Sequence, residues 1–581
     1  MIPKERFKSL KTDLVKIFLY VLLILFIALI INFYFMLQVP KPQIIIIFDD
    51  GPPAEIEREP IIIRFINYIV SFFIGDWGYS DLYGDSVLEI LRSSFPRMIE
   101  IMILPLVTGY SLGKLLKASL PNHNRMRNIF KVLGVIGIVT PIFLFGVYLQ
   151  HIFIRILPVN KWGGHTAPIV TGFLILDSII AGEWYLVIQI AVYYIFPTLF
   201  LTIIITIVTA RKTITNPTKS TQIDSIFSNS LQTGIIFSLI FTYYILVDST
   251  FHLGGFSYPL LTALRIPDFY ILQGCMFIII ILFVISIFLS NIIFTLKEPS
   301  EMGINKELKK KKTDKKKVTN LKEQVAQLKK FFIRRLKSPV SLVGASILIF
   351  LIIIVSFPHL ITPYRLSDII PPNFGDDQYA PPSKEHPLGT AQYGYDLLAL
   401  VIWGMKDLLT SGGWIIVIGL LGGIPFGILA SKYNRSDKLI VMSVMSLFFI
   451  FPGIVITMLM LRITDMDHSV QVFTIGVLLI PFITSKIANT KPEFINMFRE
   501  LIIYIPGLLF FVIIVYSSVS LFGFSSYSTP QLGYIIYRVY RMSTYLDKYW
   551  VVFWPGLAIG IINTGLVLLY LGFNPRNPKI R

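Results

Sequence analysis

The chain has 581 residues, of which 54% are apolar and only 15% are charged, and its mean hydropathy is +0.70. Because soluble proteins carry roughly 25% charged residues, this composition excludes a soluble multidomain enzyme. The 46 phenylalanines and 28 tyrosines exclude a disordered chain, and the single cysteine, Cys275, excludes a disulfide framework. The composition therefore predicts a polytopic membrane protein.

Apolar segments recur along the whole chain at lengths that approach the roughly 20 residues a helix needs to cross a bilayer. Six such segments precede the middle of the chain and six follow it. The expected spans are Ile17–Val39, Ile99–Leu112, Val132–Ile152, Trp184–Ala210, Gly234–Val247, Ile271–Leu296, Leu342–Phe357, Gly412–Ala430, Leu439–Leu461, Val470–Ile483, Leu501–Leu521 and Tyr549–Leu571. The fold class expected is all-α, with about twelve transmembrane helices in two six-helix halves.

The distribution of positive charge predicts the orientation of these spans. An even number of spans places both termini on one side, and 36 of the 52 lysines and arginines fall in the segments on that side. Cytoplasmic loops concentrate Lys and Arg, so we expect both termini to be cytoplasmic and the protein to lie in the cell membrane.

A basic segment, residues 300–337, separates the first half (1–299) from the second half (338–581). Lys309 to Lys317 holds seven lysines in nine residues, which is typical either of a solvated cytoplasmic linker or of a patch for anionic lipid or nucleic acid. The linker interpretation is favoured, and a nucleic-acid partner is not expected. Apolar residues at helical spacing then predict an amphipathic helix on the inner leaflet: Leu321, Val325, Leu328, Phe332 and Leu336. The large outer loops are expected at 40–98 and 358–410.

Residue patterns for catalysis, cofactor binding or metal binding are not found in the sequence. Gly109 to Lys114 has three residues between its glycines instead of the four of a phosphate-binding loop, and the histidines lack zinc-like spacing. The acidic segment from Asp49 to Glu59 is expected to be solvated. Glu100, near an outer helix end, is either functional or simply turned toward the interface. We therefore expect no enzymatic activity in this chain.

Glycine pairs at four-residue spacing predict close packing between membrane helices. They are Gly109/Gly113, Gly419/Gly423, Gly423/Gly427 and Gly556/Gly560. Prolines interrupt several expected spans, among them Pro197, Pro425 and Pro452, which is tolerated where the backbone faces protein or a cavity.

Several strings in the second half resemble one subunit of a known transporter family. Pro381 to Thr390 reads PPSKEHPLGT, followed by Gly394-Tyr395-Asp396, and resembles the outer loop of the second permease subunit of dipeptide/oligopeptide (nickel) ABC importers. Further matching strings follow in the same order as in that subunit, at Ile424 to Ala430, Phe451 to Gly453 and Trp554 to Ile559. The family-matching residues of the outer loop are Glu385, His386, Pro387, Leu388, Gly389, Thr390 and Asp396.

The first half resembles the partner permease subunit of the same importers. The matching strings are Gly75 to Ser80, Val87 to Leu91, Phe95-Pro96, Thr171 to Phe173, Ile195 to Leu199, Phe251 to Pro259 and Pro267 to Gly274. The resemblance implies two permease subunits fused in one chain, with the fold of a type I ABC importer permease.

The family couples to its ATPases through a Glu-Ala-Ala…Gly motif in a cytoplasmic loop, and this motif is missing from both expected places, Arg211 to Ser228 and Ser485 to Arg499. The loops are also shorter than the family's, so coupling is predicted to be reduced. The candidate ATPase-contact residues are Arg211, Lys219, Ile223, Phe227, Lys491, Glu493, Phe494 and Arg499.

The resemblance implies a permease that works by alternating access with separate ATPase subunits, two of them expected, and an extracytoplasmic substrate-binding protein. Peptides are the expected substrate, although nickel chelates and sugars use similar permeases. One alternative is an accessory or scaffold membrane protein that kept the fold and lost ATPase coupling. An ion-driven carrier ranks last, because paired carboxylates at mid-membrane are not evident in the sequence.

Overall fold

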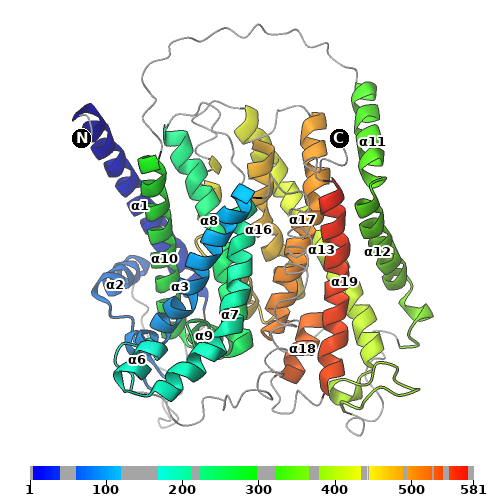
Figure 1. Ribbon diagram of the computed structural model, residues 1–581, viewed down its shortest axis with the longest axis horizontal. Helices are drawn as coiled ribbons and strands as arrows, with labels where there is room; N and C mark the ends of the chain where they lie inside the picture. The colour runs from blue at the N-terminus through cyan, green and yellow to red at the C-terminus, as the bar shows by residue number, and fades with distance from the viewer. Residues whose placement is uncertain are drawn as a thin grey trace.

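The computed structural model describes residues 4–39, 60–119, 168–211, 222–297, 321–364, 378–432, 441–442, 444–488, 494–525, 529–540 and 548–573. Long helices dominate these ranges, and ten of the helices within them are long and apolar enough to cross a membrane. The all-α, multi-pass membrane fold is therefore confirmed (Figure 1).

The first half consists of helices and one small hairpin. Its elements are α1 (Lys4–Gln38), α2 (Ile61–Ile74), β1 (Tyr79–Ser80), β2 (Asp85–Ser86), α3 (Val87–Ser119), α6 (Leu174–Ile180), α7 (Trp184–Arg211), α8 (Gln222–Phe251), α9 (Ser257–Arg265) and α10 (Phe269–Lys297). The strands pair antiparallel, with Tyr79 opposite Ser86.

The second half begins after the helix α11 (Leu321–Leu336), which lies where the apolar spacing predicts a helix. Its further elements are α12 (Pro339–Ser356), the short 3₁₀ helices η1 (Pro358–Leu360) and η3 (Gln392–Gly394), α13 (Leu397–Lys432), α15 (Gly453–Ile463), α16 (His468–Ala488), α17 (Phe494–Leu521), α18 (Leu532–Tyr540) and α19 (Tyr549–Phe573).

Each of the ten apolar helices coincides with one of the twelve expected spans, although Val39 and Phe357 lie one residue beyond the ends of α1 and α12. The expected span Val132–Ile152 lies outside the described residues. The expected span Leu439–Leu461 differs from the structure, because the chain turns at Phe448–Phe451 before α15 begins at Gly453. Pro452 precedes that helix and cannot continue a helix from the preceding residues, which explains the break. The number twelve therefore remains a prediction.

Helix α2 is an apolar helix that the sequence interpretation placed inside an outer loop. Its Tyr68 hydroxyl accepts a hydrogen bond of 2.7 Å from Asn32 of α1, and the Tyr68 ring lies 5.1 Å from that of Phe277 of α10. Its other face exposes Ile62, Phe73 and further apolar side chains, so α2 is suited to lipid contact beside α1.

The two halves share the same pattern of helix–helix contacts. In the first half α1 packs on α10, α3 on α7, and α8 on α9 and α10. In the second half α12 packs on α19, α13 on α16, and α17 on α18 and α19. Figure 1 shows the first half on the left and the second half on the right, with the start of α1 and the end of α19 at the same, upper end. We name this the inner end and the opposite one the outer end, following the predicted orientation.

Glycines hold the equivalent helix pair together in both halves. A Cβ on Gly109 or Gly113 of α3 would lie 2.8 Å from Ile205 or 2.6 Å from Thr209 of α7. On α13, a Cβ on Gly423 would lie 2.5 Å from the Cβ of Ile483 of α16. In both pairs the glycine backbone of one helix therefore contacts side chains of the other, with no room for a methyl group. Small residues allow this close approach between membrane helices.

Candidate functional site

The outer-loop motif of the second half forms a compact turn next to the start of α13. Gly389 has φ +84°, and a Cβ there would lie 2.6 Å from the carbonyl oxygen of Ala380. Thr390 and Ala380 are joined by two hydrogen bonds, from the Thr390 amide to the Ala380 carbonyl (3.0 Å) and from the Ala380 amide to the Thr390 hydroxyl (2.8 Å). Glycine is required here because other residues rarely adopt this φ.

Asp396 joins this turn to the first turn of α13. One of its carboxylate oxygens lies 3.0 Å from Nδ1 of His386, and the other accepts a 2.8 Å hydrogen bond from the amide of Ala399. The aspartate therefore caps the helix N-terminus, where an anion is favoured. His386 and Asp396 are brought together as a pair, whereas Glu385 and Pro387 are exposed on the surface of the loop.

The outer loop is also anchored to the end of the chain. Arg538 of α18 donates hydrogen bonds to the side chains of Gln392 and Tyr393, and Lys548 lies over the ring of Tyr379 at 4.1 Å. Burial raises the pKa of Tyr379 to about 12, so the lysine faces a neutral phenol and the contact is a cation–π interaction. The motif thus ties α13, α18 and α19 together at the outer end.

The first half has a corresponding connection at its outer end. The Ser80 hydroxyl of the hairpin donates a 2.6 Å hydrogen bond to Asp268, which also accepts one of 3.0 Å from the amide of Ile271 in the first turn of α10. Gly78 has φ +90°, and a Cβ there would overlap one edge of the Tyr270 ring. Two strings of the predicted resemblance, nearly 190 residues apart, therefore meet at one place.

The string Thr171-Gly172-Phe173 forms the turn before α6. The amides of Thr171 and Gly172 donate to Asp177 at 2.7 and 3.0 Å. Glu100 of α3 accepts hydrogen bonds from the amides of Leu174 and Ile175 at 3.0 and 2.8 Å. Glu100 therefore caps the start of α6, which gives it a structural role in holding α3 and α6 together.

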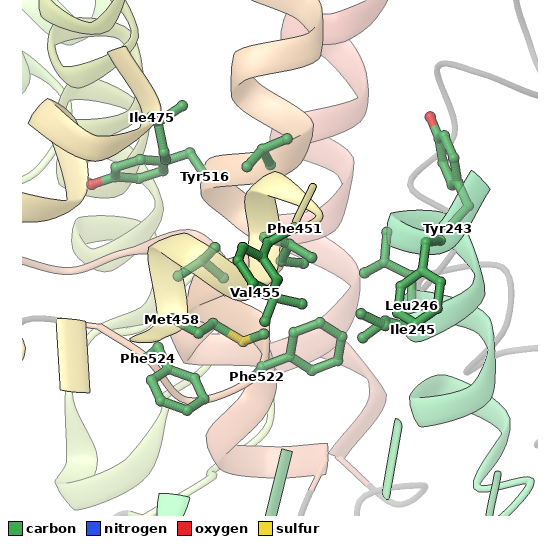
Figure 2. Packing of buried hydrophobic residues seen from close by; sticks show 14 of the residues in the cluster. Tyr243, Ile245, Leu246, Phe451, Val455, Met458, Ile475, Tyr516, Phe522 and Phe524 are labelled. Carbon is green, nitrogen blue, oxygen red and sulfur yellow. The ribbon is translucent and has the colours of Figure 1, made fainter. Parts of the chain in front are cut away.

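The two halves meet along a seam formed by α8 and α9 from the first half and α15 from the second. Figure 2 shows Ile245 and Leu246 of α8 pointing toward Phe451 and Phe522 of the second half. All four side chains are buried, as are Val455 and Met458 of α15, so the seam is closed by apolar contacts at this level.

One arginine crosses the seam. Arg265, the last residue of α9, donates from Nε and Nη2 to the carbonyl oxygen of Phe522 at 3.1 and 2.9 Å, and its guanidinium lies 5.4 Å from the ring centroid of Tyr537. Phe522 directly follows the last residue of α17, so the positive charge lies at the negative end of that helix. We name this contact the Arg265 latch.

A buried polar cluster joins α13, α16 and α17, and the sequence interpretation missed it. Asp407 of α13 accepts a 2.6 Å hydrogen bond from Tyr516 of α17 and lies 3.7 Å from Nε2 of His468, the first residue of α16. Ser411 and Gln531 also approach the histidine ring, at 3.2 and 3.5 Å. An acidic residue inside an apolar helix is the signal that could have indicated this cluster.

A second buried carboxylate, Asp248 near the end of α8, has the same kind of structural surroundings. It accepts hydrogen bonds from the amides of Gly255 and Ser257, at 3.0 and 2.9 Å, and from the hydroxyls of Ser257 and Tyr244. These donors satisfy both carboxylate oxygens, so Asp248 fixes the turn between α8 and α9.

Five of the eight candidate ATPase-contact residues lie at the inner end, and three lie outside the described ranges. Ile223 and Phe227 lie on the first turns of α8, ahead of its apolar stretch from Asn229, and Arg211 and Phe494 lie at helix termini. Their side chains are not among those described. Arg499 lies 5.9 Å from the ring centroid of Phe331 on α11. Lys219, Lys491 and Glu493 lie outside the described residues, so the predicted contact remains a prediction.

Comparisons with known proteins point to one class of protein. No family model matches the chain. The probable D,D-dipeptide transport system permease protein DdpB of Escherichia coli (strain K12) is 30% identical over 135 residues, which are 22% of this chain and 39% of that protein. The dipeptide transport system permease protein DppC of Alkalihalophilus pseudofirmus is 23% identical over 161 residues, 27% of this chain and 52% of its own.

The glutathione transport system permease protein GsiD of Pectobacterium atrosepticum is 25% identical over 154 residues, 26% of this chain and 50% of that protein. The chain thus spans about two fifths to half of the length of these relatives. Because the same stretches cover only about a quarter of this chain, the chain is longer than any of the three. The chain is therefore similar to permease subunits of peptide transport systems, and the predicted resemblance to that class is confirmed.

Proposed function

We propose that the chain is the membrane-spanning permease of an ABC importer for peptides, with both permease subunits fused in one polypeptide. The observation that carries this proposal is the repeated packing of the two halves. The pairs α1/α10, α3/α7 and α8/α10 recur as α12/α19, α13/α16 and α17/α19. Two equivalent bundles that face each other are what a transporter with alternating access requires.

The seam between the halves is suited to be the gate. It is closed by Ile245, Leu246 and Phe451 and their apolar neighbours, which carry no charge that would hold a peptide in place. In alternating access, binding energy at one end changes the relative populations of states that open on opposite sides. The arrangement described here is a state in which the outer end is held by the Arg265 latch.

Separate ATPase subunits, two of them, would supply that energy at the inner end, and an extracytoplasmic binding protein would deliver the peptide at the outer end. The relatives are transport permeases by name, which supports partners of these kinds. In this proposal both termini and the basic segment 300–337 lie in the cytoplasm, because the segments at the inner end, these three included, carry 36 of the 52 lysines and arginines.

A second candidate is an accessory or scaffold membrane protein of the same fold. It is favoured by one observation, the shortness of the inner connections. Only ten residues separate α7 from α8, and five separate α16 from α17. Either connection leaves little chain for a docking helix of its own.

ATPase association distinguishes the two candidates. We expect Ile223→Ala with Phe227→Ala, and Glu493→Ala with Phe494→Ala, to abolish co-purification of ATPase chains from native membranes, because these positions precede the apolar stretches of α8 and α17. The fold should persist in both variants, as judged by thermal unfolding in detergent.

The control carries a matched pair of changes at the outer end, Leu360→Ala with Glu385→Ala, where both side chains are exposed. This control should retain the ATPases. Variants that bind ATPase as well as the wild type would place the contact elsewhere, and a wild type that never retains an ATPase would make the scaffold the better assignment.

A further inference from the structure

Among the described residues, helix α11 packs on the second half through one of its faces. Its Phe331 ring lies 5.9 Å from the guanidinium carbon of Arg499 on α17, and its Phe332 ring lies 5.6 Å from that of Phe573 at the end of α19. Leu328 and Leu336 on the same side are partly buried. Helix α11 is therefore attached to the inner ends of α17 and α19 and leads directly into α12.

The opposite face of α11 is basic and exposed. At 100° per residue, four cationic side chains share this face with Ile333, whose side chain is 42% exposed. The cations, all exposed, are Lys329, Lys330, Arg334 and Lys337. Residues 326–337 include no Asp or Glu, so nothing on this stretch neutralises them. We name these five residues the basic face.

The basic face lies level with the inner ends of three apolar spans. The apolar span that follows α11 begins at Pro339. The two helices on which α11 packs, α17 and α19, have the inner ends of their apolar spans at Asn496 and Phe573. Because the rings of Phe331 and Phe332 contact α17 and α19, the basic face points away from the helix bundle.

We propose that the basic face of α11 is a docking surface for the anionic headgroups of phospholipids at the inner end of the protein. The four cations are complementary to phosphate groups, and Ile333 between them can enter the edge of the acyl region, as in other basic amphipathic helices. A nucleic-acid partner would match the cations but not the exposed isoleucine. The proposal does not depend on ATPase coupling, so it can fail while the proposed function stands.

The test uses the full chain with a spin label at Ile333→Cys in a Cys275→Ala background, reconstituted into vesicles of pure phosphatidylcholine or of phosphatidylcholine and phosphatidylglycerol at three to one. The measured quantity is the collision rate of the label with a water-soluble nickel reagent. We expect the rate to fall at least threefold in the anionic vesicles.

The variant K329Q/K330Q/R334Q/K337Q should show the same rate in both vesicles. The control K309Q/K310Q/K311Q/K312Q loses the same charge from the preceding linker and should behave like the wild type. The proposal is overturned if the wild type collides equally in both vesicles, or if the linker control loses the effect equally. It is also overturned if an ATPase chain binds the wild type but not the four-residue α11 variant, because the face would then belong to the ATPase.

Discussion

Replacing Arg265 with alanine is expected to open the outer end of the seam and to reduce peptide transport strongly. Arg265 donates two hydrogen bonds to the Phe522 carbonyl at the end of α17, and this bond pair links the first half to the second. Hydrogen bonds to charged groups contribute about 1.5–3 kcal/mol. Losing that amount would shift the ratio of closed to open states by about 10- to 100-fold.

The shift can be measured by pulsed electron resonance between spin labels at Ile266 and Lys384, two exposed outer positions on different halves, in a Cys275→Ala background. Arg265→Ala should add a longer distance to the distribution, and Arg265→Lys should give an intermediate result because a lysine lacks the second donor. Arg92→Ala is the control, since Arg92 is exposed and its ion pair with Glu89 lies within α3. An unchanged distribution in Arg265→Ala would remove the latch from the account.

Replacing Gly423 with alanine is expected to destabilise the second half, although only one methyl group is added. The new Cβ would lie 2.5 Å from the Cβ of Ile483 and 3.2 Å from the carbonyl oxygen of Ile480, so α13 and α16 must separate. Overpacking of this kind costs about 1–3 kcal/mol. The measurement is the midpoint of thermal unfolding in detergent.

The control for this prediction lies on the same helix. A Cβ on Gly413 meets no atom within 4 Å, so Gly413→Ala should be neutral or should stabilise α13 by about 0.5–1 kcal/mol, the usual gain from removing a glycine inside a helix. If both substitutions lower the midpoint equally, the effect belongs to glycine itself and the close packing of α13 on α16 is not its cause.

The sequence predicts the long spans well, because each is a predominantly apolar stretch whose length approaches that of the bilayer core. The sequence does not predict α2 or the break before Pro452, and the reason differs between the two. Ile61–Ile74 has 14 residues and includes Arg64 and Asn67, so it falls below the length and apolarity that indicate a span. The segment before α15 is predominantly apolar, and hydropathy alone does not reveal that the backbone turns there.

An acidic residue in an apolar helix can be read from the sequence, but the partners of the buried carboxylates cannot be predicted from a local pattern. Asp407 contacts Tyr516, which is 109 residues away in the sequence, and His468, which is about 60 residues away. The cluster therefore forms only when α13, α16 and α17 pack together. The outer-loop motif is easier to recognise from the sequence, because His386 and Asp396 are only ten residues apart along the chain. What joins Ser80 to Asp268, however, is again tertiary packing.

The central claim is that one polypeptide supplies both halves of the permease. Intact mass measurement of the complex purified from native membranes tests it most directly. The account predicts one copy of this chain together with two ATPase chains. A stable complex with two copies of this chain per pair of ATPases would contradict it.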